Sequence, residues 1–244
     1  MGFSVSIPPG GWLRQIIESS NPCQRPTARL VPSMHKYQRP VTPSEISGPL
    51  ALLVEELVPG GTPVYVDVRP IEGAAPDECF RLVERQVDAF AGKAIFGWSL
   101  WVFPTLFVEA EFHSVWERPD GCLIDITPKK REMKRVLFLK DQERLYIGKQ
   151  VNNLRRKVRQ LPLLDSYFKT FDDQHELLNR GERANMHGKI ELEGNEALEF
   201  QHIVQRRADC HLELQYYFPL VGAYLPCPCG SGKKTKWCHK EYLS

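Results

Sequence analysis

Long apolar runs are missing from this 244-residue sequence, and its N-terminal segment does not place an apolar block after a basic start. We therefore expect a chain with no membrane span and no secretory signal, located in the cytoplasm. An excess of one charge is missing too, since the formal net charge is only +2. Overall charge therefore gives no argument for a nucleic-acid partner. Internal repeats and low-complexity tracts are also absent, which excludes solenoid and fibrous architectures.

Positive charge is nevertheless concentrated in one part of the chain. Between positions 129 and 159 only Glu132, Asp141 and Glu143 offset a run of basic residues. The run consists of Lys129, Lys130, Arg131, Lys134, Arg135, Lys140, Arg144, Lys149, Arg155, Arg156, Lys157 and Arg159. Such a pattern is typical of a solvated face, and this is the interpretation we favour. Nucleic acid, a ribosome or an acidic partner bound through residues 129–159 is the alternative.

Seven cysteines are present, and this odd number indicates a reducing compartment rather than a disulfide framework. Three of them lie in the C-terminal tail, where Cys227, Cys229, Cys238 and His239 follow the spacing C-x-C-x8-C-H. Three thiolates and one imidazole are a ligand set of closed tetrahedral Zn²⁺ sites, and glycines between the cysteines allow a tight turn. The tail therefore predicts a zinc knuckle that folds around its metal. Disulfides, or thiols in an unfolded tail, are the alternative.

The segment from Pro226 to His239 resembles the SEC-C motif, a zinc-binding tail found on the bacterial preprotein translocase ATPase and on many unrelated proteins. The similarity covers about residues 225–240. It implies a docking element whose partner is a protein, such as an export chaperone or the ribosome. Thr235 and Trp237 depart from the common pattern, which affects the expected partner more than the metal site. No Walker motif precedes the tail, so the chain is not a translocase ATPase.

Composition and element patterns together predict an α+β protein in four parts. These are a proline-rich lead-in (1–48), an α+β module (49–145), a helical segment (146–219) and the zinc-binding tail (222–244). The α+β module should combine a central helix with an antiparallel sheet, an arrangement compatible with a papain-like fold.

Apolar periodicity predicts the elements within these parts. Strands are expected over residues 62–68, 94–102, 106–116, 122–127 and 135–139. Helices are expected over residues 12–18, 46–57, 150–160, 166–179 and 195–217, and one more should open within residues 76–79 and end at Ala91 and Gly92. Asp77 would be the N-cap of this last helix, with Cys79, Val83, Val87 and Phe90 on one stripe.

The α+β module contains a candidate catalytic set in Cys79, His113 and Asp125. A helix start favours a thiolate, and a histidine oriented by a carboxylate can take up and return its proton. This chain order resembles that of papain-like and transglutaminase-like thiol hydrolases over about residues 62–140. The resemblance implies a peptidase or amidase. The glutamine that papain relatives place before the cysteine is missing, and Glu78 would oppose a thiolate. Alternatively, Cys79 is a small buried residue on the Val83 and Val87 stripe.

His113 also belongs to an alternating pattern in which Glu109, Glu111 and His113 share one face of a strand. Two carboxylates and an imidazole could hold a metal or could orient His113. They could also form a solvent-facing polar row on an edge strand. We therefore expect a zinc-binding protein whose tail docks onto a protein partner, with a cysteine hydrolase using Cys79, His113 and Asp125 as the alternative.

Overall fold

The computed structural model combines helices with β-sheet, which confirms the α+β class. It describes residues 4–7, 40–75, 78–129, 133–185, 190–217, 222–227 and 231–238. The expected helix at 12–18 lies outside this part of the chain. No helix within the described ranges is both long enough and apolar enough to cross a bilayer.

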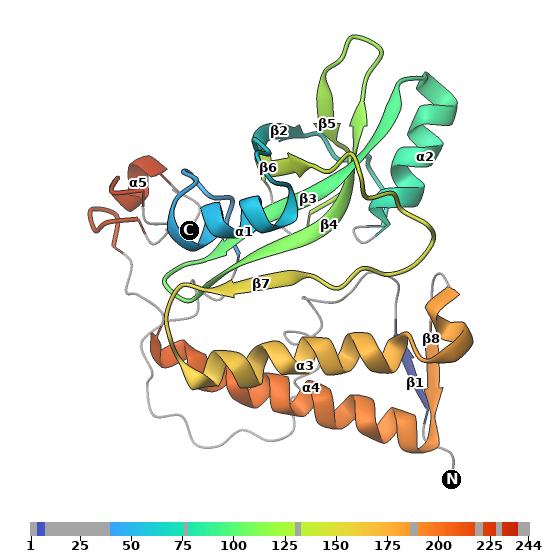
Figure 1. The fold of residues 1–244 in the computed structure, drawn as a ribbon, viewed down its shortest axis with the longest axis vertical. Helices are drawn as coiled ribbons and strands as arrows, with labels where there is room; N and C mark the ends of the chain where they lie inside the picture. The colour runs from blue at the N-terminus through green and yellow to red at the C-terminus, as the bar shows by residue number, and fades with distance from the viewer. Residues whose placement is uncertain are drawn as a thin grey trace.

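A six-stranded sheet forms the centre of the molecule (Figure 1). Its strands are β2 (Val64–Val68), β3 (Lys93–Phe103), β4 (Phe107–Glu117), β5 (Leu123–Asp125), β6 (Arg135–Lys140) and β7 (Leu154–Lys157). Their order is β3-β6-β2-β5-β4-β7, and β3 also pairs with β4 along its whole length. Only β2 and β5 run parallel; the other neighbours are antiparallel. The four strands expected after residue 93 are therefore confirmed.

Gly97 allows β3 to pair on both of its edges. It lies opposite His113 of β4 and opposite Lys140 of β6. A Cβ atom at this position would stand only 2.2 Å from the carbonyl oxygen of Leu139. Because that distance is far below van der Waals contact, a side chain here would force β6 away from β3. The missing side chain thus sets the close approach of β6 at the level of His113.

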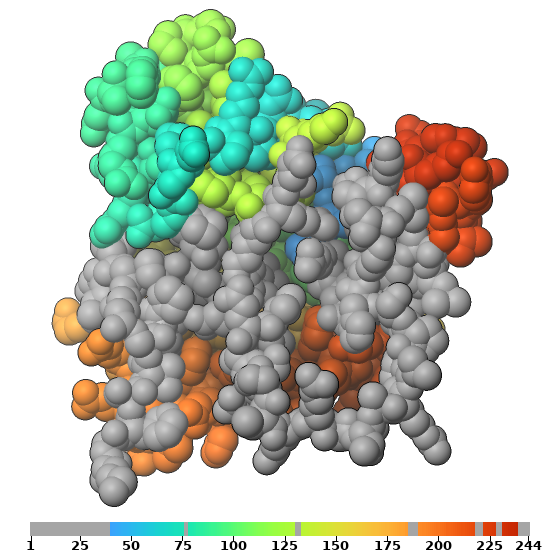
Figure 2. Space-filling view, turned by 180° about the vertical axis from the view of Figure 1, so that it is seen from behind, coloured from blue at the N-terminus to red at the C-terminus, as the bar shows by residue number. Residues whose placement is uncertain are grey.

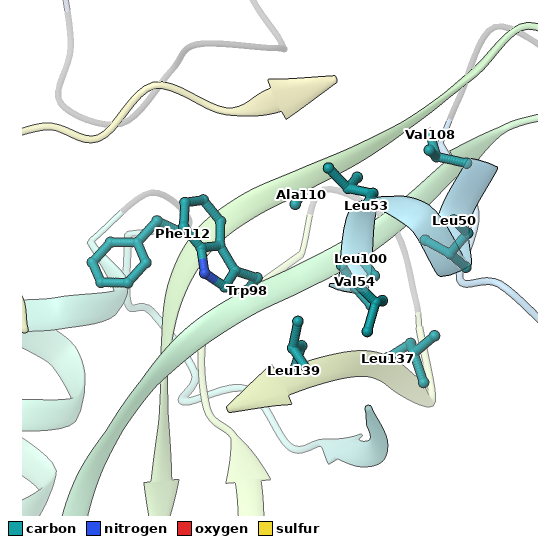
Figure 3. Packing of buried hydrophobic residues seen from close by; sticks show 10 residues of the cluster. All are labelled: Leu50, Leu53, Val54, Trp98, Leu100, Val108, Ala110, Phe112, Leu137 and Leu139. Carbon is teal, nitrogen blue, oxygen red and sulfur yellow. The ribbon is translucent and has the colours of Figure 1, made fainter. Parts of the chain in front are cut away.

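One face of the sheet is covered by α1 (Gly48–Leu57), which begins two residues later than expected. Leu50, Leu53 and Val54 point from this helix into an apolar cluster with side chains of β3, β4 and β6 (Figure 3). The sheet contributes Trp98, Leu100, Val108, Ala110, Phe112, Leu137 and Leu139 to this cluster. Val108, Ala110 and Phe112 alternate along β4, so the expected apolar face of that strand is confirmed.

The second helix, α2 (Cys79–Phe90), lies at the open end of the β3–β4 hairpin, away from the turn that joins the two strands (Figure 1). Its Leu82 and Val83 pack with Ile124 and Ile126 beside β5. Two expectations about this helix are wrong. Its N-cap is Glu78, which makes no side-chain capping bond, and not Asp77, which lies outside the described residues.

The other error concerns the last residue of the apolar stripe. Phe90 is 63% exposed, because the helix ends there and its last turn extends past the cluster. Ala91 and Gly92 follow with φ angles of 59° and 90°, so the chain leaves the helix where the sequence placed its end.

Residues 150–160, expected as an amphipathic helix, contain β7 instead. The strand pairs antiparallel with β4, from Phe107 opposite Lys157 to Ala110 opposite Leu154. A free edge of β4 offers backbone hydrogen bonds that local helix propensity cannot match, so tertiary pairing overrides the sequence pattern. As a result β4 has hydrogen-bonded neighbours on both sides, and residues of the expected helical segment join the central sheet.

Below β7, α3 (Pro162–Leu178) and α4 (Gly194–Leu214) form an antiparallel pair (Figure 1). The short strands β1 (Ser4–Ile7) and β8 (Ile190–Glu193) pair antiparallel at the end of these helices. Single 3-10 turns follow each helix, at Gly181–Asn185 and Gln215–Tyr217. Seen from behind, α2 and this helical layer lie at opposite ends of the molecule (Figure 2). The two later helices expected from the sequence are therefore confirmed.

Candidate functional site

His113 and Asp125 meet where β4 and β5 diverge. The two strands pair only at Trp116 opposite Ile124 and at Glu117 opposite Leu123. β5 also pairs with β2, at Ile124 and Asp125, and His113 lies on β4 just before this paired stretch. Its Nε2 lies 3.1 Å from Oδ2 of Asp125, with the two side chains 5% and 0% exposed. The structure thus brings together two of the three residues of the candidate catalytic set.

Asp125 is held in one orientation by several donors. Its Oδ1 accepts the backbone N–H of Thr127 at 3.0 Å, and its Oδ2 lies 2.6 Å from the Lys129 ammonium. The backbone N–H of Arg69 donates to its carbonyl oxygen. A carboxylate fixed in this way can hold the imidazole in one tautomer and one orientation.

The mutual attraction of His113 and Asp125 keeps both of these buried side chains ionised. Burial by itself would raise the pKa of Asp125, but His113 and Lys129 outweigh it and hold that pKa well below the usual range. Burial likewise lowers the pKa of His113 and Lys129 lowers it further, yet Asp125 and Cys79 together raise it to about 10. At neutral pH the site therefore holds an imidazolium paired with the Asp125 carboxylate.

Cys79 is the first residue of α2 and is buried, with 8% exposure. Val83 and Val87 pack with Leu82, Ile124 and Ile126, and Cys79 is not part of that cluster. Instead, charge on the Cys79 thiol is one of the causes that raise the pKa of His113, so the two groups interact electrostatically. Because Asp125 binds Nε2, the ring nitrogen that could serve the thiol is Nδ1.

The two glutamates that precede His113 on β4 have their own partners. Glu109 is fully buried and accepts hydrogen bonds from Arg155 Nε at 2.7 Å and Asn153 Nδ2 at 3.0 Å. Glu111 accepts the Trp101 indole N–H at 3.0 Å. The expectation of a solvent-facing row on an edge strand is therefore wrong, because β7 covers that side of β4. No group of three metal-ligating side chains occurs among the described residues, here or elsewhere.

Two residues near the site escaped the sequence analysis. Lys129 belongs to the basic run that we assigned to a solvated face, yet its side chain is 6% exposed and pairs with Asp125. Its spacing of four residues from Asp125 was the available signal. Tyr146 had no signal at all, because its ring stacks on Phe80 from a loop far along the chain, with centroids 3.8 Å apart.

Other members of the basic run are also committed to internal contacts. Ion pairs join Arg155 to Glu109, Arg156 to Glu56 and Lys157 to Asp165. Guanidinium groups of this run also lie over aromatic rings: Arg135 over Tyr65, Arg144 over Trp98 and Arg159 over Tyr217. The three ion pairs offset part of the positive charge that the run can offer to phosphate groups, whereas the contacts with aromatic rings leave the charge unchanged.

Two of the four expected zinc ligands lie in the described part of the tail. Cys227 is buried, and Cys238, at the end of α5 (Thr235–Cys238), packs against the same apolar cluster. The main part of the molecule contributes Phe103, Leu106, Leu164, Tyr167 and Leu214 to this cluster. Cys229 and His239 lie outside the described residues.

The tail chain folds back on itself between these two cysteines. Pro226 and Lys234 form an antiparallel bridge, and the Cys227 N–H donates to the Lys233 carbonyl at 2.7 Å. Ser231 Oγ lies 3.1 Å from the Cys238 sulfur. A turn that returns Cys238 toward Cys227 fits the donor set expected for a structural zinc ion.

A scan against protein-family models and searches of curated proteins and solved structures find no match to this chain. The resemblances noted above therefore depend on the tail motif and on the order of Cys79, His113 and Asp125.

Proposed function

We propose that the protein is a cysteine hydrolase that cleaves an acyl bond, in the manner of a peptidase or amidase. The observation that carries this proposal is the buried 3.1 Å contact between His113 Nε2 and Asp125 Oδ2, with Cys79 buried as the first residue of α2. Cys79 is the nucleophile, His113 transfers the proton and Asp125 orients the imidazole.

In the first half-reaction the Cys79 thiolate attacks the acyl carbon and forms a C–S bond, while the carbonyl π electrons move to oxygen. The oxyanion then collapses, the bond to the leaving group breaks, and the His113 imidazolium donates its proton to that group.

In the second half-reaction water attacks the thioester and His113, now neutral, accepts a proton from it. Collapse of the second tetrahedral species breaks the C–S bond, releases the carboxylic acid and regenerates the Cys79 thiolate beside the His113 imidazolium. Asp125 keeps its negative charge throughout, because Lys129 and the Thr127 N–H stabilise it. No additional co-reactant is required.

Replacement of the nucleophile tests this function. We expect Cys79→Ser to abolish hydrolysis of p-nitrophenyl acetate and labelling of this site by iodoacetamide, as mapped by peptide mass spectrometry. Cys122→Ser is the matched control, because Cys122 is an exposed thiol in the turn between β4 and β5. Turnover that survives in the Cys79 variant would refute the hydrolase.

A second function is proposed for the tail: a zinc knuckle that docks the protein onto a protein partner. The supporting observation is that the described turn places Cys227 and Cys238 against one apolar cluster. Cys227, Cys229, Cys238 and His239 would hold Zn²⁺ as a structural ion, which would stabilise the turn and take no part in hydrolysis. Resemblance to the SEC-C motif indicates a chaperone or the ribosome as partner.

Metal analysis tests the tail independently of catalysis. We expect one zinc per chain by plasma mass spectrometry, and its loss in Cys227→Ser and Cys238→Ser. Cys210→Ser is the control, because Cys210 packs against the same cluster from α4 without belonging to the motif. Equal zinc in all variants would refute the knuckle.

A further inference from the structure

Tyr146 lies beside the start of α2 because its ring stacks on Phe80, the residue that follows Cys79. The two ring centroids are 3.8 Å apart and the planes differ by only 4°. Phe80 is itself fixed, since its ring contacts Phe96 and Phe112 of the β3–β4 hairpin at 6.1 and 5.5 Å. This aromatic column holds the Tyr146 ring against the first turn of α2, the turn that begins with Cys79.

The phenol also interacts with the thiol electrostatically. Burial raises the pKa of Tyr146, negative charge on Cys79 raises it further, and Arg81 lowers it only in part. A hydroxyl in this environment keeps its proton at neutral pH, so it can donate a hydrogen bond.

The hydrolase requires such a donor. A tetrahedral species formed at Cys79 places negative charge on the former carbonyl oxygen, and preorganised donors must stabilise it. The glutamine that papain relatives use is missing, because neither Gln nor Asn occurs in residues 72–78. Glu78 cannot donate as a carboxylate, and it makes no side-chain bond to the first N–H groups of α2. These N–H groups provide one side of an oxyanion site, which needs a second donor.

We propose that the Tyr146 hydroxyl is this second donor and hydrogen-bonds the oxyanion that forms when Cys79 attacks an acyl carbon. The inference depends on the proposed hydrolase function. As the C–S bond forms, the carbonyl oxygen takes up the π electron pair and accepts the Tyr146 O–H bond. Tyr146 keeps its proton, since His113 supplies the one that the leaving group takes. Tyr146 thus performs the role that an amide side chain has in papain-like enzymes.

Removal of the Tyr146 hydroxyl oxygen tests its proposed role as the oxyanion donor. Tyr146→Phe preserves the ring that stacks on Phe80, so the aromatic column and the fold should persist. We expect kcat/KM for p-nitrophenyl acetate to fall about 100-fold or more, mainly through kcat, as for the loss of one oxyanion donor. Alkylation of Cys79 by iodoacetamide forms no oxyanion, so its rate should change less than about 3-fold. Tyr216→Phe is the control, since Tyr216 is 85% exposed on a 3-10 turn after α4.

The outcomes separate this inference from the function on which it depends. If Tyr146→Phe keeps wild-type kcat/KM while Cys79→Ser is inactive, Tyr146 is not the donor and the hydrolase stands. If Tyr146→Phe slows alkylation and turnover equally, the tyrosine positions the thiol, and the oxyanion role is refuted. If the wild-type chain shows neither Cys79-dependent turnover nor an acylated Cys79 by mass spectrometry, both proposals fail.

Discussion

Two buried carboxylates, Glu109 on β4 and Asp125 on the neighbouring strand β5, have pKa values shifted in opposite directions. Asp125 contacts His113 of β4 and Lys129, and these cations hold its pKa low. Glu109 lies four residues before His113 on β4, and burial raises its pKa although Arg155 and Asn153 donate hydrogen bonds to it. Both groups are fully buried, so burial alone does not explain the difference.

The neighbouring charges explain it, because Glu109 has one cation, Arg155, and the nearby Glu111 raises its pKa further. Asp125 interacts with two positive groups, one of which is an imidazole that can lose its proton. Glu109 is paired with a guanidinium that stays charged at every accessible pH and whose Cζ lies 4.1 Å from the centroid of the Phe171 ring. The Glu109 pair can therefore stabilise the junction between β4 and β7 but cannot transfer a proton. The Asp125 pair can do both, which is why we place the chemistry there.

Replacement of each carboxylate by its amide should give the largest difference between the Asp125 and Glu109 sites. We expect Asp125→Asn to lower the free energy of unfolding by about 3–5 kcal/mol, because it leaves Lys129 buried without a carboxylate. It should also slow iodoacetamide alkylation of Cys79 at pH 7 at least ~10-fold, because His113 would lose the charge that keeps it protonated. Urea titration and peptide-resolved alkylation measure the two effects.

Glu109→Gln serves as the matched comparison on the same strand. It should also destabilise the fold, by an equal or smaller amount, because Arg155 keeps its contact with Phe171. Its rate of Cys79 alkylation should equal that of the wild type. Equal slowing in the two variants would show that the carboxylates do not differ in function.

The alkaline pH dependence of stability should give an intermediate effect. The folded-state pKa of His113 is raised to about 10, so its contribution is complete below its ordinary pKa and is lost as pH rises toward 10. We expect the free energy of unfolding to fall on the order of a few kcal/mol from pH 7 to pH 10.

The two carboxylate variants provide the controls for that profile. Glu109→Gln should keep the alkaline loss, whereas Asp125→Asn should flatten it, because Asp125 causes the rise in the His113 pKa. Urea titrations at several pH values measure these slopes. A steep alkaline slope in Asp125→Asn would mean that another group is responsible.

Exchange of the guanidinium at position 155 should give the smallest effect. Arg155 donates from Nε to Glu109 and from Nη1 to the carbonyl of Asn153. A lysine ammonium keeps the positive charge but lacks the planar guanidinium with its several N–H donors. We therefore expect Arg155→Lys to lower the free energy of unfolding by about 1–2 kcal/mol. Thermal unfolding measures it, and Cys79 alkylation should not change. A catalytic defect in this variant would connect the Glu109 pair to the site.

Local patterns predicted most of the fold. Apolar alternation located β3, β4 and β6, and helical periodicity located α2, α3 and α4, because both depend on spacing along the chain. The segment at 150–160 could not be predicted in this way. Its strand exists because β4 has an edge to pair with, and that edge is far away in sequence.

The candidate site was likewise predicted only in part from the sequence. Cys79, His113 and Asp125 were recognised as residue types in a chain order, and the structure joins His113 to Asp125. Lys129 was assigned to the surface, because sequence gives charge but not burial. Tyr146 was not found, because its proximity to α2 depends on stacking between rings distant along the chain.

The sequence by itself determined the spacing of the candidate ligands in the tail, the order of the candidate catalytic residues and the α+β class, since each is a matter of residue type and spacing. Tertiary structure decided which acid meets which cation. Glu109 and His113 share a face of β4, but β7 brings an arginine to one, and the divergence of β5 brings a carboxylate to the other. Contacts of this kind depend on strand pairing at long range, which no local pattern encodes.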